Sequence, residues 1–141
     1  MDLIKYLGTN ILNTLSLLRG NADIVNYSKI EGDEFLQAPE SGYYLQSKNE
    51  TGVISNIRIF FEEHDGFFPS KYKLRGKYLL VKNFDDLNML LGQPTKDIKP
   101  INIPGSTPTL AGKQYIDDTH IVSGYSKNGK NITFLHIKIN E

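Results

Sequence analysis

The segment Asn83–Thr95, N-F-D-D-L-N-M-L-L-G-Q-P-T, carries the start, body and stop signals of one short helix. Asn83 suits the N-cap because its side-chain oxygen can accept an N–H of the first turn, where acidic residues also suit the helix dipole. Gly92 favours the C-cap, and Pro94 cannot continue the helix. Apolar residues recur at helical spacing on one face: Phe84, Leu87, Leu90 and Leu91. We therefore predict a helix that packs its apolar face on a sheet.

The N-terminal region predicts further helical structure. One helix is expected over residues 2–7, and a second should begin after Thr9 or Asn10 and end at Gly20. A single helix over 2–19 is the alternative, because one internal glycine costs a helix only about 1 kcal/mol.

Alternating apolar and polar residues predict strands on both sides of the central helix. In the strongest, Val53–Glu63, residues 53, 55, 57, 59 and 61 should face the core, and Asn56, Arg58 and Phe60 should face water. Weaker strand signals cover residues 24–27, 34–36, 42–47, 73–81, 114–116, 120–125 and 131–139. The pair Asn128-Gly129 favours a type I′ hairpin turn before the last strand.

The two halves of the chain resemble each other around these hairpins. Ser47-Lys48-Asn49 leads into one apolar strand, and Ser126-Lys127-Asn128 leads into another. This echo favours a helix–strand–strand unit used twice. The expected fold class is α+β, a twisted antiparallel sheet with helices packed on one face, in a single domain spanning 1–141.

Composition limits the classes of function. The chain has 141 residues, and its Lys+Arg and Asp+Glu counts are both 16, which argues against a general nucleic-acid binder. It has no cysteine, so disulfides, thiolate metal sites and cysteine nucleophiles are excluded. The beginning, M-D-L-I-K-Y-L-G-T-N, resembles neither a signal peptide nor a membrane span. A cytoplasmic location and no membrane partner are therefore expected.

The sequence carries no recognisable catalytic motif. Phosphate-cradling and dinucleotide-binding loops are missing, and no serine lies in a G-x-S-x-G context. Of the three histidines, none is at metal-ligand spacing from another, and His136 is expected on an exposed strand face. We therefore expect no enzyme activity, catalytic residue, metal or cofactor. A small hydrolase that pairs His64 or His120 with a carboxylate remains an alternative.

A protein-binding surface is the stronger expectation. Aromatic side chains offer large rigid contact areas, and acidic groups speed the capture of a basic partner. The long loop over residues 95–109, rich in proline, is a further place for a partner. The predicted partner-binding residues are Glu62, Glu63, Asp65, Phe67, Phe68, Asp117 and Asp118.

Two segments resemble a known class of bacterial proteins. Residues 3–15, L-I-K-Y-L-G-T-N-I-L-N-T-L, resemble the opening of pyocin and bacteriocin immunity-like proteins. Residues 76–94, G-K-Y-L-L-V-K-N-F-D-D-L-N-M-L-L-G-Q-P, resemble a segment of immunity proteins from polymorphic-toxin and contact-dependent growth inhibition systems. In that class a helix ending L-G-x-P precedes a loop, a strand like Tyr115-Ile116-Asp117 and a terminal hairpin.

The resemblance implies a cytoplasmic, non-enzymatic immunity protein. Such an antitoxin binds one cognate protein toxin, often a nuclease, and occludes its active site or substrate surface. The matching residues are Gly8, Gly76, Leu91, Gly92, Pro94 and Tyr115. All six have structural explanations, so the resemblance supplies no contact residues. An adaptor module for secretion or assembly, which would bind another protein, is the alternative.

Overall fold

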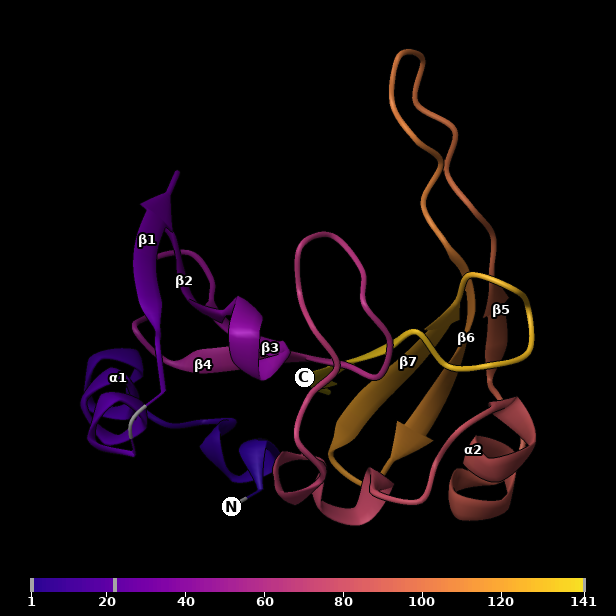
Figure 1. Cartoon of the computed structure of the whole chain (residues 1–141), viewed down its shortest axis with the longest axis horizontal. Helices are drawn as coiled ribbons and strands as arrows, with labels where there is room; N and C mark the ends of the chain where they lie inside the picture. Colours follow the sequence, from indigo (N-terminus) through magenta and orange to yellow (C-terminus); the bar gives the residue numbers. More distant parts are fainter. Residues whose placement is uncertain (1, 22, 141) are drawn as a thin grey trace.

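One eight-stranded antiparallel sheet dominates the computed structural model, which describes residues 2–21 and 23–140 (Figure 1). The two ends of the predicted 1–141 domain lie outside the described residues. The strands lie in the order β1-β2-β3-β4-β8-β7-β6-β5. Their bounds are β1 Asn26–Ile30, β2 Asp33–Ala38, β3 Tyr43–Ser47, β4 Ile54–Phe60, β5 Lys96–Ile98, β6 Ala111–Asp117, β7 His120–Ser126 and β8 Phe134–Ile139.

The helical segments are few and short compared with the eight-stranded sheet. The α-helices are α1 Ile11–Gly20 and α2 Phe84–Leu91, and the 3-10 helices are η1 Leu3–Tyr6, η2 Pro39–Ser41, η3 Tyr72–Leu74 and η4 Gly76–Tyr78. The expected α+β class is therefore wrong, and the protein is mainly β. The local sequence signals correctly predicted where the helices α1 and α2 form. The segments that carry them are too short to form a full helical layer over eight strands.

The central helix α2 confirms its sequence signals. The Asn83 side chain accepts the N–H of Asp86 at 2.8 Å, and Gly92 follows the helix with a φ of 85°. Leu87 is fully buried, whereas Leu90 is 42% exposed. The apolar face that packs on the sheet is thus narrower than predicted.

The N-terminal region confirms two helical segments in place of one. Asp2 caps η1, and the Asn10 side chain accepts the N–H groups of Leu12 and Asn13 at the start of α1. The predicted strand over 73–81 is wrong, because these residues form η3, η4 and turns. Its buried apolar residues are Leu74, Tyr78 and Val81, a helical spacing.

Each half of the chain places an α-helix before four antiparallel strands, and the halves join where β4 pairs with β8. The expected unit had two strands, so it was wrong in size. Ser47 ends β3 and Ser126 ends β7, at corresponding places in the two halves. The predicted type I′ turn is also wrong, because only Gly129 of the pair has a positive φ. The Asn128 side chain instead accepts the N–H groups of two following residues.

The sheet has two unlike faces. The helix face carries most of the core, in which side chains from η1, α1, η3, η4 and α2 pack on the strands. Its largest fully buried members from the strands are Tyr43, Tyr115, Leu36, Leu45, Ile54, Ile57 and Ile59. The opposite face, here called the open face, carries Asn56, Arg58 and Phe60. The predicted wet surface is wrong for Asn56 and Phe60, which are only 4% and 1% exposed. Phe60 belongs to a second apolar cluster.

Candidate functional site

Two projections border the open face. The first is the loop 61–71, which leaves the end of β4. The second is the arm 99–110, which connects β5 to β6. In Figure 1 both rise on the side of the sheet opposite α1 and α2, and the arm extends far beyond the strands. The residues between them form the best candidate for a binding site.

An aromatic cluster forms the base of this region. Phe67, from the loop 61–71, stacks on Phe60 with ring centroids 4.4 Å apart. Phe134 lies 5.5 Å from Phe60 and 4.8 Å from Tyr125. Tyr44 completes the cluster at 6.1 Å from Phe67. These contacts hold the loop against the sheet and give the site a rigid apolar floor.

A cluster of three polar side chains, Arg58, His136 and Asn56, lies on this floor. The Arg58 guanidinium stacks over Phe134 at 4.2 Å and over Tyr44 at 5.2 Å. Its Nε donates to His136 Nδ1 at 3.2 Å, and His136 Nε2 lies 3.0 Å from the side-chain nitrogen Nδ2 of Asn56. Burial, together with the positive charges of Arg58, Lys48 and Lys138, lowers the pKa of His136 to about 3. The ring is therefore neutral near pH 7.

A groove of about 310 Å³ separates the loop from the arm. The sheet contributes Arg58, Tyr125 and Phe134 to its lining. The loop contributes His64 and Asp65, whose side chains are 3.3 Å apart. The arm contributes the segment Thr107–Leu110 and residues near its base. A ligand in this groove would touch the aromatic floor, one arginine and one acidic residue.

The arm itself has little contact with the core. Residues 99–109 are all exposed, and Ile101 and Ile103 have exposed fractions of 59% and 55%. The corresponding connection in the first half, between β1 and β2, is only Glu31-Gly32. The fold can therefore join these strands with two residues, and the long arm is an addition that the sheet does not require.

The structure separates the predicted binding residues into two groups. Glu63, Asp65 and Phe68 are exposed on the loop 61–71, beside the groove or its rim. Glu62 is partly buried and accepts a hydrogen bond from the Thr133 hydroxyl at 2.7 Å. Phe67 is only 8% exposed, so the expectation of an exposed contact residue is wrong there.

The second group lies elsewhere. Asp117 ends β6, where Lys77 Nζ donates to both of its carboxylate oxygens at 2.8–2.9 Å and the Tyr78 hydroxyl donates at 2.7 Å. Asp118 follows in the turn with a φ of 55°. β7 separates this turn from Lys127, which contacts the loop at Glu63, and six strand steps span about 20 Å. The predicted acidic surface is therefore not continuous.

Two central residues of the site, Arg58 and His136, were not among the predicted ones. They are 78 positions apart in the chain, and only the pairing of β4 with β8 brings them opposite each other. The sequence signal was present in part, because Arg58 alternates with apolar residues and so must face away from the helix side. His136 was expected to be exposed, but it is packed within this polar group.

The features that catalysis would need are sparse in the described ranges, residues 2–21 and 23–140. No serine or threonine hydroxyl in these ranges hydrogen-bonds a histidine, and no cluster of three potential metal ligands occurs there. His120 begins β7, and its registered partner on β6 is Asp117, whose carboxylate is bound by Lys77. Within the same ranges, no helix has the length and apolarity needed to cross a bilayer.

Comparisons with known proteins add a likeness of fold. No family model matches the chain, and neither does any curated protein sequence. A solved structure of a cysteine-rich secretory protein from Staphylococcus aureus subsp. aureus Mu50 matches with a TM-score of 0.53 and 9% sequence identity. The match covers 96% of this chain and 45% of that chain, so this protein spans less than half of its structural neighbour. At this identity the likeness concerns the fold alone.

Proposed function

We propose that this protein is a non-catalytic binding domain that holds a protein partner on the open face, between the loop 61–71 and the arm 99–110. The arm carries the proposal. It projects from the sheet with Ile101 and Ile103 more than half exposed, and the fold does not require it. Exposed apolar side chains on such a projection gain burial only when a partner covers them.

The groove between the two projections suits the same role. Its floor combines rigid aromatic rings with an arginine, the residue types that dominate binding energy at protein interfaces. Arg58 is already positioned by its stacking on Phe134 and its hydrogen bond to His136. A bound partner would therefore not have to order this side chain, which lowers the entropic cost of association.

The partner we propose is a bacterial toxin domain, neutralised in the cytoplasm by occlusion of its active site or substrate surface. This specific identity rests on the resemblance of residues 3–15 and 76–94 to immunity proteins. The arm and the groove are consistent with occlusion, because a projecting arm can enter a cleft of the partner while the floor contacts its rim.

The test is co-expression with the product of the neighbouring upstream gene, scored for growth rescue and for co-purification. Rescue with a stoichiometric complex is the expected result. If the upstream gene product co-purifies with this protein but is not toxic when expressed alone, the adaptor alternative is favoured. If the two proteins neither rescue nor co-purify, this partner is wrong.

Paired variants test the surface separately from the partner. Ile101→Ser and Ile103→Ser should together weaken the complex at least about tenfold, because each removes apolar area at the proposed contact. Ile30→Ser in the edge strand β1 is the matched control, because Ile30 is 61% exposed at the far end of the sheet. If the wild type, the Ile101→Ser/Ile103→Ser double variant and the Ile30→Ser control bind the partner equally well, the arm is not the contact.

A further inference from the structure

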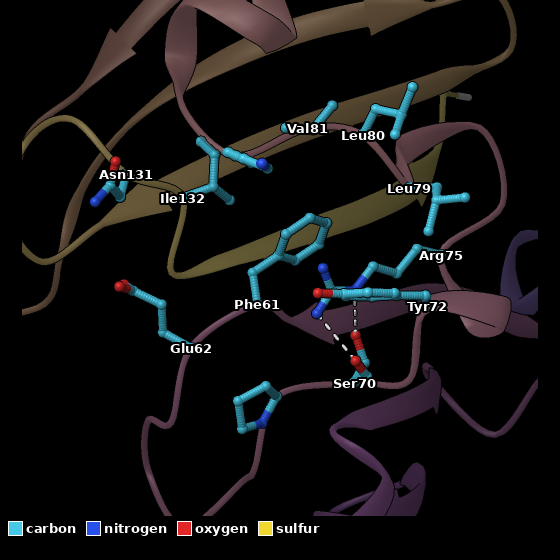
Figure 2. Close-up of a pocket in the computed structure, with 12 residues that line it drawn as sticks. Phe61, Glu62, Ser70, Tyr72, Arg75, Leu79, Leu80, Val81, Asn131 and Ile132 are labelled. Atoms are coloured by element: carbon cyan, nitrogen blue, oxygen red, sulfur yellow. Dashed lines mark hydrogen bonds between the residues drawn. The ribbon is translucent and has the colours of Figure 1, made fainter.

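A second concave region lies apart from the open-face groove and shares no residue with it. It is a hollow of about 690 Å³ beside η3, η4 and the segment that leads to α2. Its wall is largely apolar, with Phe61, Tyr72, Leu79 and Leu80 among the lining residues. Arg75, at the inner wall, is only 6% exposed (Figure 2).

Among the residues that the structure describes, hydrogen bonds hold the Arg75 guanidinium along one edge only. Its Nε donates to Ser70 Oγ and its Nη2 donates to the Ser70 carbonyl oxygen, both at 2.9 Å. The guanidinium also stacks over Phe61 at 4.2 Å and over Tyr72 at 4.9 Å. Figure 2 shows these two hydrogen bonds, with the guanidinium beside Tyr72 and Phe61. Because a guanidinium carries five N–H donors, its Nη1 edge stays available.

The charge of Arg75 has no counter-ion among the described residues, since none of the ion pairs found there includes it. Two other charged residues line the hollow, Lys82 and Glu62. Glu62 lies on the far side of Phe61 in Figure 2 and accepts the hydrogen bond from Thr133. Burial lowers the pKa of Arg75, the direction expected for a desolvated cation. An anion at the free edge would relieve this cost.

The apolar surface of the hollow continues beyond it. Leu80 is 81% exposed and also lines a neighbouring depression with Met89 and Leu90, which are 89% and 42% exposed. Tyr72 is 70% exposed. Adjacent large apolar side chains this exposed are typical of a contact surface. A ligand for this region therefore needs an anionic group for Arg75 and apolar groups next to it.

We propose that the hollow binds the carboxyl-terminal residue of a peptide or protein whose last side chain is apolar. The terminal carboxylate would accept from the free edge of Arg75, since a planar guanidinium matches a carboxylate. The last side chain would pack against Phe61 and Leu79, and the preceding residue against Leu80. A terminal residue fits best because its carboxylate is attached directly to the Cα that carries the apolar group. This proposal does not rest on the proposed toxin-binding function.

The test uses the full chain and the peptide acetyl-Gly-Ser-Gly-Leu-Phe with a free carboxyl terminus. The matched controls are the same peptide as its C-terminal amide and an amidated peptide with an internal glutamate. The free acid should bind at least about tenfold more tightly than either control, the scale of a charge-assisted hydrogen bond. In ¹⁵N NMR the acid should shift the Arg75 side-chain signal. Equal affinities, or shifts confined to Arg58, would overturn the proposal.

Variants provide an independent check. Leu80→Asp places a carboxylate at the rim and removes apolar area, so affinity for the free acid should fall at least about tenfold. Leu17→Asp is the control, because Leu17 is 57% exposed on α1, away from the hollow. Arg75→Gln should reduce the affinity for the acid to that for the amide. Since Arg75 also holds Ser70, Leu80→Asp decides the matter if Arg75→Gln does not fold. Unchanged binding by Leu80→Asp would overturn the proposal.

Discussion

Gly42 lies against the loop 61–71, and its replacement by alanine is the sharpest test of how this loop is held on the open face. Gly42 has a φ of 74°, which L residues rarely adopt. A Cβ there would lie 2.3 Å from the Phe68 carbonyl oxygen and 2.5 Å from the Ser70 nitrogen. Both are backbone atoms, so no side-chain rotation can relieve the overlap.

Gly52 supplies the control for the backbone strain alone. Its φ is 70°, and a Cβ there would meet nothing within 4 Å. Gly52→Ala should therefore cost only the left-handed strain, about 1 kcal/mol after the gain from a less flexible unfolded chain. Gly42→Ala adds the displacement of the loop, which overpacking data place at about 1–3 kcal/mol, for a total of about 2–4 kcal/mol.

Equilibrium unfolding in urea measures both losses of unfolding free energy. A Gly42→Ala loss that exceeds the Gly52→Ala loss by more than about 1 kcal/mol supports the reasoning. The Phe67 ring signals should also shift in Gly42→Ala, because Phe67 would leave its stacking contact with Phe60. If the two variants lose the same free energy within about 0.5 kcal/mol, the close approach of the loop to Gly42 is refuted.

Three further predictions concern two residues of the open face and the N-cap of α2. Because the pKa of His136 in the folded protein is lowered from 6.5 to about 3, the free energy of unfolding should fall as pH drops below 6.5, by up to about 1.4 kcal/mol per pH unit. His136→Gln should flatten this slope, as measured by urea unfolding at acidic pH. Asn83→Ala should cost about 1 kcal/mol of unfolding free energy through the lost cap on Asp86, measured in urea. Phe67→Ala should cost about 3–5 kcal/mol by opening the cluster around Phe60, measured by thermal unfolding; a loss under about 1 kcal/mol would mean that Phe67 is not packed there.

Local signals were sufficient to predict α2 and the two N-terminal helical segments. In these places the capping side chain, the apolar spacing and the stop residue lie within a few positions of one another. The error at residues 73–81 also has a local cause. Leu74, Tyr78 and Val81 are spaced as in a helix, but Gly76 and the adjacent apolar pair Leu79-Leu80 hide that pattern.

The turn type predicted at Asn128-Gly129 was wrong, although the sequence motif is a strong one. Asn-Gly is the strongest sequence signal for a type I′ turn, yet Asn128 uses its side chain to bind the following N–H groups. The two-residue connection between β1 and β2, Glu31-Gly32, does have two consecutive positive φ values, 51° and 90°. A glutamate rarely adopts such a φ, so propensity could not indicate this turn.

The candidate site on the open face could not be predicted because it depends on strand register. Arg58 and His136 meet only where β4 pairs with β8, and Phe67 reaches Phe60 only because the loop folds back past Gly42. The predicted acidic residues failed as one surface for the same reason. The length of β7 separates the acidic residues of the loop 61–71 from Asp117 and Asp118. Neither composition nor a motif reveals this separation.

If the arm 99–110 binds a partner as proposed, shortening it should raise stability and lower affinity. Residues 102–108, seven in all, extend beyond the hydrogen bonds that join Ile101 and Thr109. Replacing them with Asn-Gly shortens the closed loop from seven residues to two, which should stabilise the fold by about 1 kcal/mol through loop-closure entropy. The same change removes Ile103 and should weaken partner binding. A shortened arm that destabilises the protein, measured in urea, would mean that the arm contributes to the core, and the reason for assigning it to a partner would disappear.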